Sequence, residues 1–240
     1  FDEASGDIIN QATSVGSTDS LGTSADIAIT GATYSQTGKI GDALSFDGTN
    51  DLGVCGTSLS QYQFMYSANA KFTLCMWYKP SSTISTQSIT SMAGNFGTGN
   101  QNGFNIHLWD DSSTAGNVGV NVLGESGNTR YIDTTLANLG TDDTNWHFLC
   151  VRFDGTTSGH SAGNNVEASI DAGTFATAST SSAPSGTNNA DETFKISVYP
   201  TTSIARYFAG LIDETTIWNR VLTDAEITTL YNSGRGKIVY

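Results

Sequence analysis

Several residue types are scarce in this 240-residue chain. Lysine and arginine number 10 against 23 acidic residues, which gives a net charge of −13. We therefore expect no nucleic-acid partner, because phosphate binding needs a basic surface. No apolar run approaches the ~20 residues of a membrane-spanning helix, so we expect no membrane insertion. Because the chain begins at Phe1 rather than methionine, we expect it to be a piece of a longer protein.

Strong helix-forming stretches are also scarce, whereas short strand patterns are common. Glycine accounts for 26 residues, and serine, threonine and asparagine are abundant. This composition is typical of many strands joined by polar turns. We expect residues 81–102 to form a long polar connection, residues 104–109 and 194–199 to be strands, and residues 174–193 to be a loop or a weak edge strand. No linker divides the chain, so residues 1–240 are predicted to form one all-β domain.

Two segments have apolar residues at successive positions rather than at alternate ones. Phe72-Thr-Leu-Cys-Met-Trp-Tyr-Lys-Pro80 is the stronger, and Trp146-His-Phe-Leu-Cys-Val-Arg-Phe153 is the second. Successive side chains of a strand point to opposite faces, so both faces of these strands are apolar. Such strands are buried on both sides, which favours a two-layer sandwich.

The C-terminal region predicts a strand followed by a single helix. Residues 211–218 are rich in branched and aromatic residues. Thr223 and Glu226 have the spacing of a capping box, and Gly234 lies where a left-handed residue ends a helix. Three apolar residues of the helix share one face: Ile227, Leu230 and Tyr231.

Two motifs resemble the laminin G-like and pentraxin-like domains of the concanavalin A-like lectin/glucanase superfamily. The first is Gly-Lys-Ile-Gly-Asp-Ala-Leu-Ser-Phe-Asp-Gly at residues 38–48. The second runs over residues 207–234 and includes Leu-Ile-Asp-Glu-Thr-Thr-Ile-Trp-Asn-Arg. The resemblance implies an antiparallel jelly-roll sandwich of two sheets with one short C-terminal helix.

The same resemblance implies a disulfide and a metal ion. Cys75 and Cys150 lie in segments similar to the two strands that pentraxins join by a disulfide; the alternative is a pair of buried thiols. The superfamily also suggests a structural calcium ion joining the first and last strands, with Asp47 and Asp213 as ligands. Alternatively, Asp47 caps a turn and Asp213 is hydrogen-bonded near the end of a sheet.

Catalytic signatures are absent from the sequence. A glycosidase needs two carboxylates that face one cleft, and no strand carries alternating acids in that pattern. No Gly-x-Ser-x-Gly motif occurs, and the three histidines are scattered. We therefore expect a protein that is not an enzyme.

Sugar binding needs an exposed aromatic ring beside amide and carboxylate groups. Trp109, Asp110 and Asp111 end a predicted strand and fit this description, and Tyr131 is a further candidate; the alternative for Trp109 is simple packing. The leading hypothesis is a recognition module at a cell or particle surface that binds glycans. The alternative is a structural or adhesive module of a virus, phage or surface layer, which self-associates or binds other proteins. Both place the chain outside the cell or on a virion.

Overall fold

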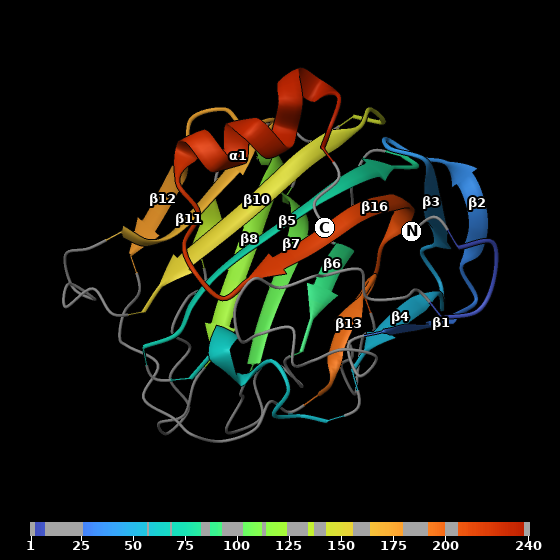
Figure 1. The fold of residues 1–240 in the computed structure, drawn as a ribbon, viewed down its shortest axis with the longest axis horizontal. Coiled ribbons are helices and arrows are strands. Elements are labelled where there is room, and N and C mark those ends of the chain that lie inside the picture. The colour runs from blue at the N-terminus through green and yellow to red at the C-terminus, as the bar shows by residue number, and fades with distance from the viewer. Residues whose placement is uncertain are drawn as a thin grey trace.

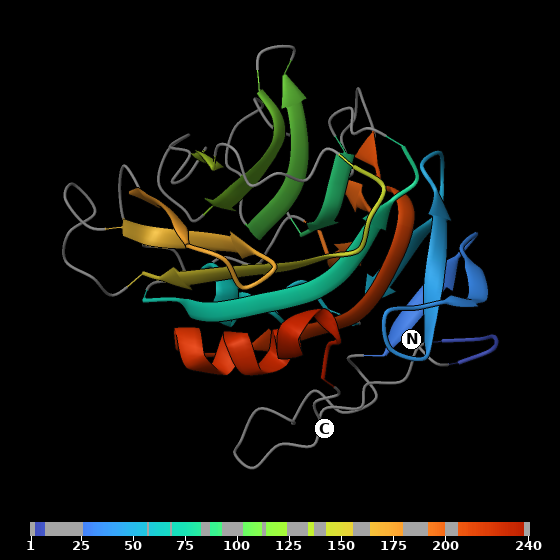
Figure 2. The same ribbon diagram turned by 90° about the horizontal axis from the view of Figure 1, so that it is seen from above.

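The fold is a sandwich of two sheets with one helix on its outer side. The computed structural model describes residues 3–7, 26–56, 58–67, 69–82, 87–92, 103–111, 114–123, 134–136, 143–155, 164–179, 192–199 and 206–237. Each large sheet has seven strands, and the strand pairs of the described residues are antiparallel. Figures 1 and 2 show the order of the layers: helix α1, then one sheet, then the other.

The first sheet, called sheet A, lies on the side of the sandwich away from the helix. Its strands, in spatial order, are β1 (Ile27–Thr30), β4 (Leu52–Cys55), β13 (Phe194–Ile196), β6 (Gln87–Ser91), β7 (Gly103–Asp111), β8 (Thr114–Leu123) and β9 (Thr134–Leu136).

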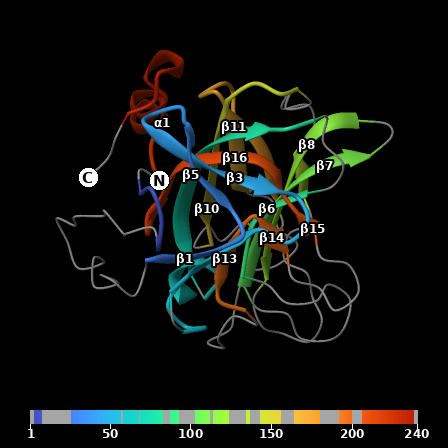
Figure 3. The same ribbon diagram turned by 90° about the vertical axis from the view of Figure 1, so that its right-hand side faces the viewer.

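The second sheet, called sheet B, lies between sheet A and the helix. Its strands, in spatial order, are β12 (Ala176–Ser179), β11 (Asn164–Ile170), β10 (His147–Asp154), β5 (Lys71–Pro80), β16 (Ala209–Trp218), β3 (Asp42–Asp47) and β2 (Thr33–Thr37). A separate two-stranded ribbon is formed by β14 (Val198–Tyr199) and β15 (Arg206–Tyr207). Figure 3 shows the side of the sandwich where β1 of sheet A approaches β3 of sheet B.

The main core fills the space between the two sheets. Alternate residues of each strand point into it, as expected from the period of two in a strand. Phe72 and Leu74 of β5, Phe104 of β7 and Val151 of β10 are fully buried there. The aromatic rings of Phe72 and Phe104 meet edge to face across the two sheets, with centroids 5.5 Å apart.

A second core lies on the other side of sheet B, beneath the helix. Cys75 and Trp77 of β5 and Phe148 of β10 point outward and pack against Ile227 of α1 (Asp224–Tyr231). The ring of Tyr231 stacks on Trp77 at a centroid distance of 5.7 Å. The two-faced strands predicted from the sequence are therefore β5 and β10, each buried between the main core and the helix.

Helix α1 begins at the predicted position, after the capping residue Thr223. The Thr223 hydroxyl accepts the N–H of Glu226, and the Glu226 carboxylate accepts the N–H of Thr223, which completes the capping box. The helix ends two residues before the predicted position. Asn232 has φ 49° and terminates the helix, and Gly234 (φ 80°) follows in a 3₁₀ turn at Asn232–Gly234.

Two strand predictions were wrong in detail. The predicted connection over residues 81–102 contains β6, whose residues are all buried although its sequence, Gln-Ser-Ile-Thr-Ser, is polar. The predicted strand over residues 194–199 is broken at Ser197, which has φ 71°, so that β13 pairs within sheet A and β14 pairs with β15. The weak edge strand expected within residues 174–193 is β12.

Cys75 and Cys150 lie opposite each other in the β5–β10 pair and form a disulfide. The bond joins positions 75 residues apart and lies in the core beneath the helix. Cys55 is buried and unbridged.

We predict that removing this disulfide with Cys75→Ala/Cys150→Ala lowers the free energy of unfolding by about 4–5 kcal/mol, because the unfolded chain regains the entropy of a ~75-residue loop. Denaturant titration with and without reductant measures the loss. Cys55→Ala, which keeps the bridge, should retain the full sensitivity to reductant. An equal midpoint in both conditions for the parent chain would contradict the prediction.

Candidate functional site

Sheet A carries a row of polar side chains on the face turned away from the core. In β7, Phe104, Ile106 and Leu108 point into the main core, so Asn105 and His107 occupy the opposite face. Both are nonetheless buried, with 2% and 4% of their surface exposed. Burying a polar group costs free energy unless the group is hydrogen-bonded, so these side chains need hydrogen-bond partners.

Three side chains of the row form a hydrogen-bonded chain across β6 and β7. The hydroxyl of Ser88 donates to Oδ1 of Asn105 at 2.7 Å, and the other end of the Asn105 amide lies 3.2 Å from Nδ1 of His107. An amide nitrogen only donates, so Nδ1 of His107 accepts and the ring proton of the neutral imidazole is on Nε2. We call Ser88, Asn105 and His107 the polar ladder.

A glycine of the neighbouring strand β8 leaves space for the His107 side chain. His107 lies opposite Gly119 of β8, and a Cβ atom at Gly119 would overlap the imidazole ring at Nε2, Cε1 and Cδ2. Only a residue without a side chain leaves space for the ring at this position on β8. The glycine therefore sets the position of His107 from the neighbouring strand.

The ladder leads along β7 towards the residues predicted to bind sugar. Trp109 follows His107 by two residues and pairs with Asn117 of β8, and Asp111 pairs with Thr114 at the end of the hairpin. Trp109, Asp110 and Asp111 belong to β7, which extends two residues beyond the predicted strand over 104–109, and β7 pairs with β8 there. Tyr131 lies outside the described residues. The roles of these four residues in binding stay predictions.

Sequence reasoning missed the ladder, although a signal for it was present. The segment Phe104-Asn-Ile-His-Leu-Trp109 alternates apolar residues with Asn105, His107 and Trp109. The polar side of that alternation marks the face on which the ladder lies. Ser88 could not be found in this way because the polar composition of β6 concealed a buried strand.

The structure separates the two predicted calcium ligands. Asp47 ends β3 opposite Ala209, whereas Asp213 lies four residues further along β16, opposite Trp77 of β5. At ~3.3 Å per residue, the two positions are about 13 Å apart along the strand. Asp47 and Asp213 therefore do not fit one shared ion, and among the described residues no group of three His, Cys, Asp or Glu side chains could hold a metal.

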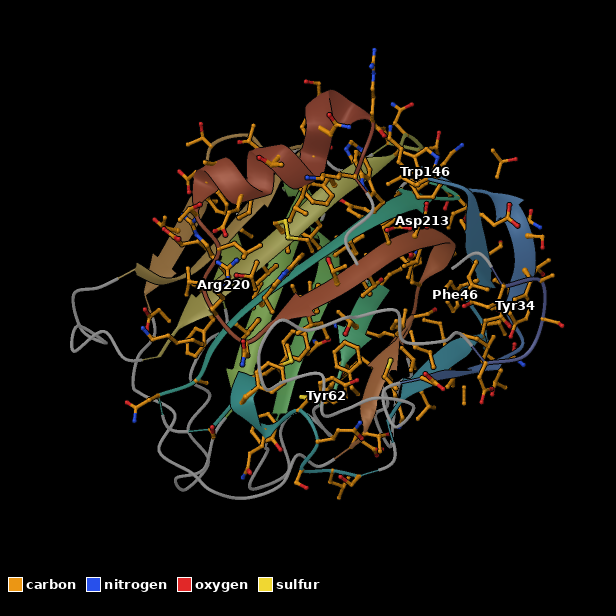
Figure 4. All side chains as sticks on the ribbon, in the orientation of Figure 1. Tyr34, Phe46, Tyr62, Trp146, Asp213 and Arg220 are labelled. Carbon is orange, nitrogen blue, oxygen red and sulfur yellow. A yellow bond between two sulfur atoms is a disulfide. The ribbon has the colours of Figure 1, made fainter. Side chains whose placement is uncertain are left out.

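Each of these two carboxylates accepts hydrogen bonds from backbone N–H groups. Oδ1 of Asp47 accepts the N–H of Thr49 at 2.7 Å and closes an exposed turn. Oδ2 of Asp213 accepts the N–H groups of Lys39 and Ile40 at 2.8 and 2.9 Å and so fastens the β2–β3 turn to β16. Figure 4 shows Asp213 on the part of β16 beside β3.

Burial raises the pKa of Asp213, and the hydrogen bonds from the backbone N–H groups of Ile40 and Lys39 oppose this effect. The carboxylate is fully buried. An acid enclosed in this way by its own backbone is not open to a substrate, so Asp213 is a structural residue rather than half of a catalytic pair.

The two seven-stranded antiparallel sheets define a jelly-roll β-sandwich. The family profile described as the concanavalin A-like lectin/glucanases superfamily matches residues 56–228. The chain therefore belongs to this superfamily, whose description names both sugar-binding proteins and enzymes.

Several solved structures share the fold. Domain 4 of AbnA, a GH43 extracellular arabinanase from Geobacillus stearothermophilus in complex with arabinotriose, is 19% identical, with a TM-score of 0.55 over 86% of this chain and 91% of that one. Trypanosoma rangeli sialidase in complex with sialic acid is 16% identical, with a TM-score of 0.55 over 89% of this chain. The binding domain of botulinum neurotoxin DC with SialylT is 14% identical, with a TM-score of 0.53 over 86% of this chain.

The extent of these matches differs. This chain spans 31% of the sialidase chain and 46% of the toxin chain. At such identities the likeness shows the fold alone. A comparison with curated protein sequences finds no significant match. Within the described part of the chain, no helix is both long and apolar enough to cross a membrane.

We predict that Gly119→Ala displaces the His107 ring and lowers the free energy of unfolding by about 1–3 kcal/mol through overpacking. The double variant His107→Ala/Gly119→Ala removes the overlap. The cost of Gly119→Ala should therefore be smaller in the His107→Ala background, which a double-mutant cycle of denaturant titrations measures. Equal costs in both backgrounds would show that the ring does not depend on the glycine.

We also predict that Asp213→Ala lowers the free energy of unfolding by roughly 2–4 kcal/mol, because two backbone donors lose their acceptor. Asp213→Asn keeps one acceptor oxygen and should lose less. Asp47→Ala is the control: its turn is exposed, so the loss should stay below about 1 kcal/mol. Thermal unfolding with calcium and with EDTA tests the metal directly. A calcium-dependent gain that Asp213→Asn abolishes would contradict a purely structural Asp213.

Proposed function

We propose that this chain is a non-catalytic glycan-recognition module, and that its sugar contacts the strand end formed by β7 and β8. The observation that carries the proposal is the polar ladder. It is a buried, hydrogen-bonded row of uncharged side chains on the outer face of sheet A, and Trp109 follows its last member, His107, by two residues in β7.

The ladder supports recognition by making the strand end rigid. Its three side chains bond one another, and their positions are set by the β6–β7 and β7–β8 registers. Sites held by locked neighbours lose less entropy when a ligand binds, and they keep contact groups within a narrow range of positions. A strand end supported in this way suits a ligand that is recognised through several weak contacts.

The residue types at this strand end support a sugar site. Trp109 pairs with Asn117, and Asp111 pairs with Thr114. Strand alternation predicts that Trp109 and the ladder share one face. An aromatic ring covers the C–H face of a sugar, while amide and carboxylate groups bond its hydroxyls. We assign these roles to Trp109, Asp110 and Asp111, with Tyr131 as a further contact.

The relatives support the same class of ligand. The superfamily description includes lectins, and the similar structures hold ligands: arabinotriose for the arabinanase domain, sialic acid for the sialidase and SialylT for the toxin domain. Glucanases in the same description use paired carboxylates. Here the buried Asp213 is bound by backbone N–H groups, which favours binding over hydrolysis.

The described surface favours a sugar over a large protein partner. Leu59, with 39% of its surface exposed, is the one exposed large hydrophobic residue in the part of the chain that the structure describes. Stable protein interfaces need an extended apolar centre. The disulfide supports an extracellular location, because such bonds persist in oxidising compartments.

The test is a glycan array, run with calcium and with EDTA, followed by affinity measurement for the strongest ligand. Trp109→Ala should raise the Kd at least about tenfold, which corresponds to about 1.4 kcal/mol. Leu59→Ala, which removes an exposed side chain elsewhere, should leave the Kd unchanged. Binding should persist in EDTA, because the predicted calcium ligands do not meet.

Two outcomes would contradict the proposal. Absence of binding to any glycan, together with stable self-association, would favour the structural module. Hydrolysis of a bound oligosaccharide would make the protein an enzyme.

A further inference from the structure

A second hydrogen-bonded group lies in sheet B and is separate from the proposed sugar site. It is centred on His147, the first residue of β10, whose side chain is only 9% exposed. Nε2 of His147 lies 2.9 Å from Oδ1 of Asp143, and Nδ1 lies 3.1 Å from Oδ2 of Asp171. One imidazole therefore contacts two carboxylates, one at each ring nitrogen.

This geometry selects the protonation state of the ring. An ionised carboxylate can only accept hydrogen bonds, and a neutral imidazole has a single N–H to donate. Both contacts can be hydrogen bonds only when the ring carries two N–H groups, which is the imidazolium form. Loss of one proton would place a ring lone pair against a carboxylate oxygen.

The two carboxylates belong to different segments. Asp171 begins the turn between β11 and β12, with φ 55°, and Ala172 follows with φ 51°. The turn is tied to β10 twice, because Oδ1 of Asp171 accepts the N–H of Phe148 at 2.8 Å, and the N–H of Asp171 donates to the Phe148 carbonyl at 2.9 Å. His147 adds the third bond.

Asp143 lies in the segment that enters β10. Its Oδ1 also accepts the N–H of Asn145 at 2.6 Å, which shapes the chain immediately before Trp146. Trp146, labelled in Figure 4, packs against the core beneath the helix. His147 thus joins the entry to β10 and the β11–β12 turn at the same end of sheet B.

Four titratable groups surround this point in the described structure. Asp143 faces the ring from the entry segment and Asp171 from the turn. Tyr78 faces it from β5, with ring centroids 5.7 Å apart. Tyr231 of α1 lies near Asp171, and burial together with that carboxylate raises the pKa of Tyr231. Within this cluster, His147 is the residue whose ordinary pKa lies near neutral pH.

We infer that His147 is a proton-dependent clasp, which as an imidazolium holds the β11–β12 turn and the entry to β10 together and which loosens when it loses its proton. The clasp lies in sheet B, whereas the polar ladder and Trp109 lie in sheet A, so the inference does not depend on the proposed function.

The charges agree with this geometry. Burial lowers the pKa of His147, but the hydrogen bonds and charges of Asp171 and Asp143 outweigh it, so that the pKa is raised above its ordinary value. The backbone hydrogen bond from Asn145, with a further contribution from His147, lowers the pKa of Asp143. The acid therefore stays ionised while the ring is charged.

The direction of the pH dependence follows. A histidine whose pKa is raised by folding stabilises the fold fully below its unfolded pKa of about 6.5, and this contribution is lost as pH rises through the folded pKa. Asp143 acts in the opposite sense, and its contribution is lost as pH falls through its lowered pKa. The clasp is thus tight in mildly acidic solution and opens on the alkaline side.

The direct test is NMR titration of the His147 ring in the whole chain labelled with ¹⁵N. At pH 5.5 both ring nitrogens should give signals of protonated nitrogen, and the ring should titrate above the ordinary value. Asp171→Asn and Asp143→Asn should each lower the measured pKa, because each removes one charge and one acceptor. A single neutral tautomer at pH 5.5, or a pKa at or below the ordinary value, would overturn the inference.

The second test is the pH dependence of stability. The melting temperature of the parent chain should exceed that of His147→Gln most at pH 5.5, and the difference should shrink by pH 8.5. The control Asp154→Asn removes a carboxylate paired with Lys71 at 3.0 Å, and its effect should be the same at both pH values. Parallel curves for the parent and His147→Gln would contradict the clasp. If His147→Gln does not fold, the ring titration of Asp171→Asn decides.

Discussion

The structure depends on the burial of β5 on both of its faces. One face of the strand points into the core between the sheets, and the other carries Cys75 and Trp77. A strand that is apolar on both sides needs two covers. Sheet A provides the first, and α1 provides the second. The helix is therefore a part of the hydrophobic core, held by a capping box at its start and by the stacking of Tyr231 on Trp77 at its end.

The buried polar groups connect elements that the hydrophobic core alone would not align. Asp213 fastens the β2–β3 turn to β16, His147 joins the β11–β12 turn to the entry of β10, and the polar ladder joins β6 to β7. Each group makes hydrogen bonds that offset part of the cost of burying polar atoms. The three groups differ in charge: Asp213 is an acid enclosed by backbone donors, His147 is a cation between two acids, and the ladder is neutral. A neutral, rigid row suits the recognition of sugar hydroxyls, whereas the charged groups have structural and pH-dependent roles.

Membership of the concanavalin A-like superfamily accounts for the sandwich, but many activities occur on one fold. The function must therefore be argued from side chains. The proposed sugar site and the His147 clasp lie on different sheets, so a change of pH can act on the stability of sheet B without altering the residues that face the ligand. In this arrangement one sheet carries the proposed sugar site, and the other carries the disulfide, the helix and the proposed clasp.

The parts of the fold that depend on local pattern could be predicted from the amino-acid sequence. Successive apolar residues marked β5 and β10, Thr223 and Glu226 marked the start of the helix, and family resemblance supplied the disulfide partners. Only the tertiary structure decided what depends on contacts between distant segments. The polar strand β6 is buried because its neighbours cover it, Gly119 is required because His107 lies over it, and Asp47 and Asp213 stay apart because the β3–β16 register separates them. Alternation along one strand indicates which of its faces is buried, whereas the side chain that lies opposite on the next strand depends on the pairing across the sheet.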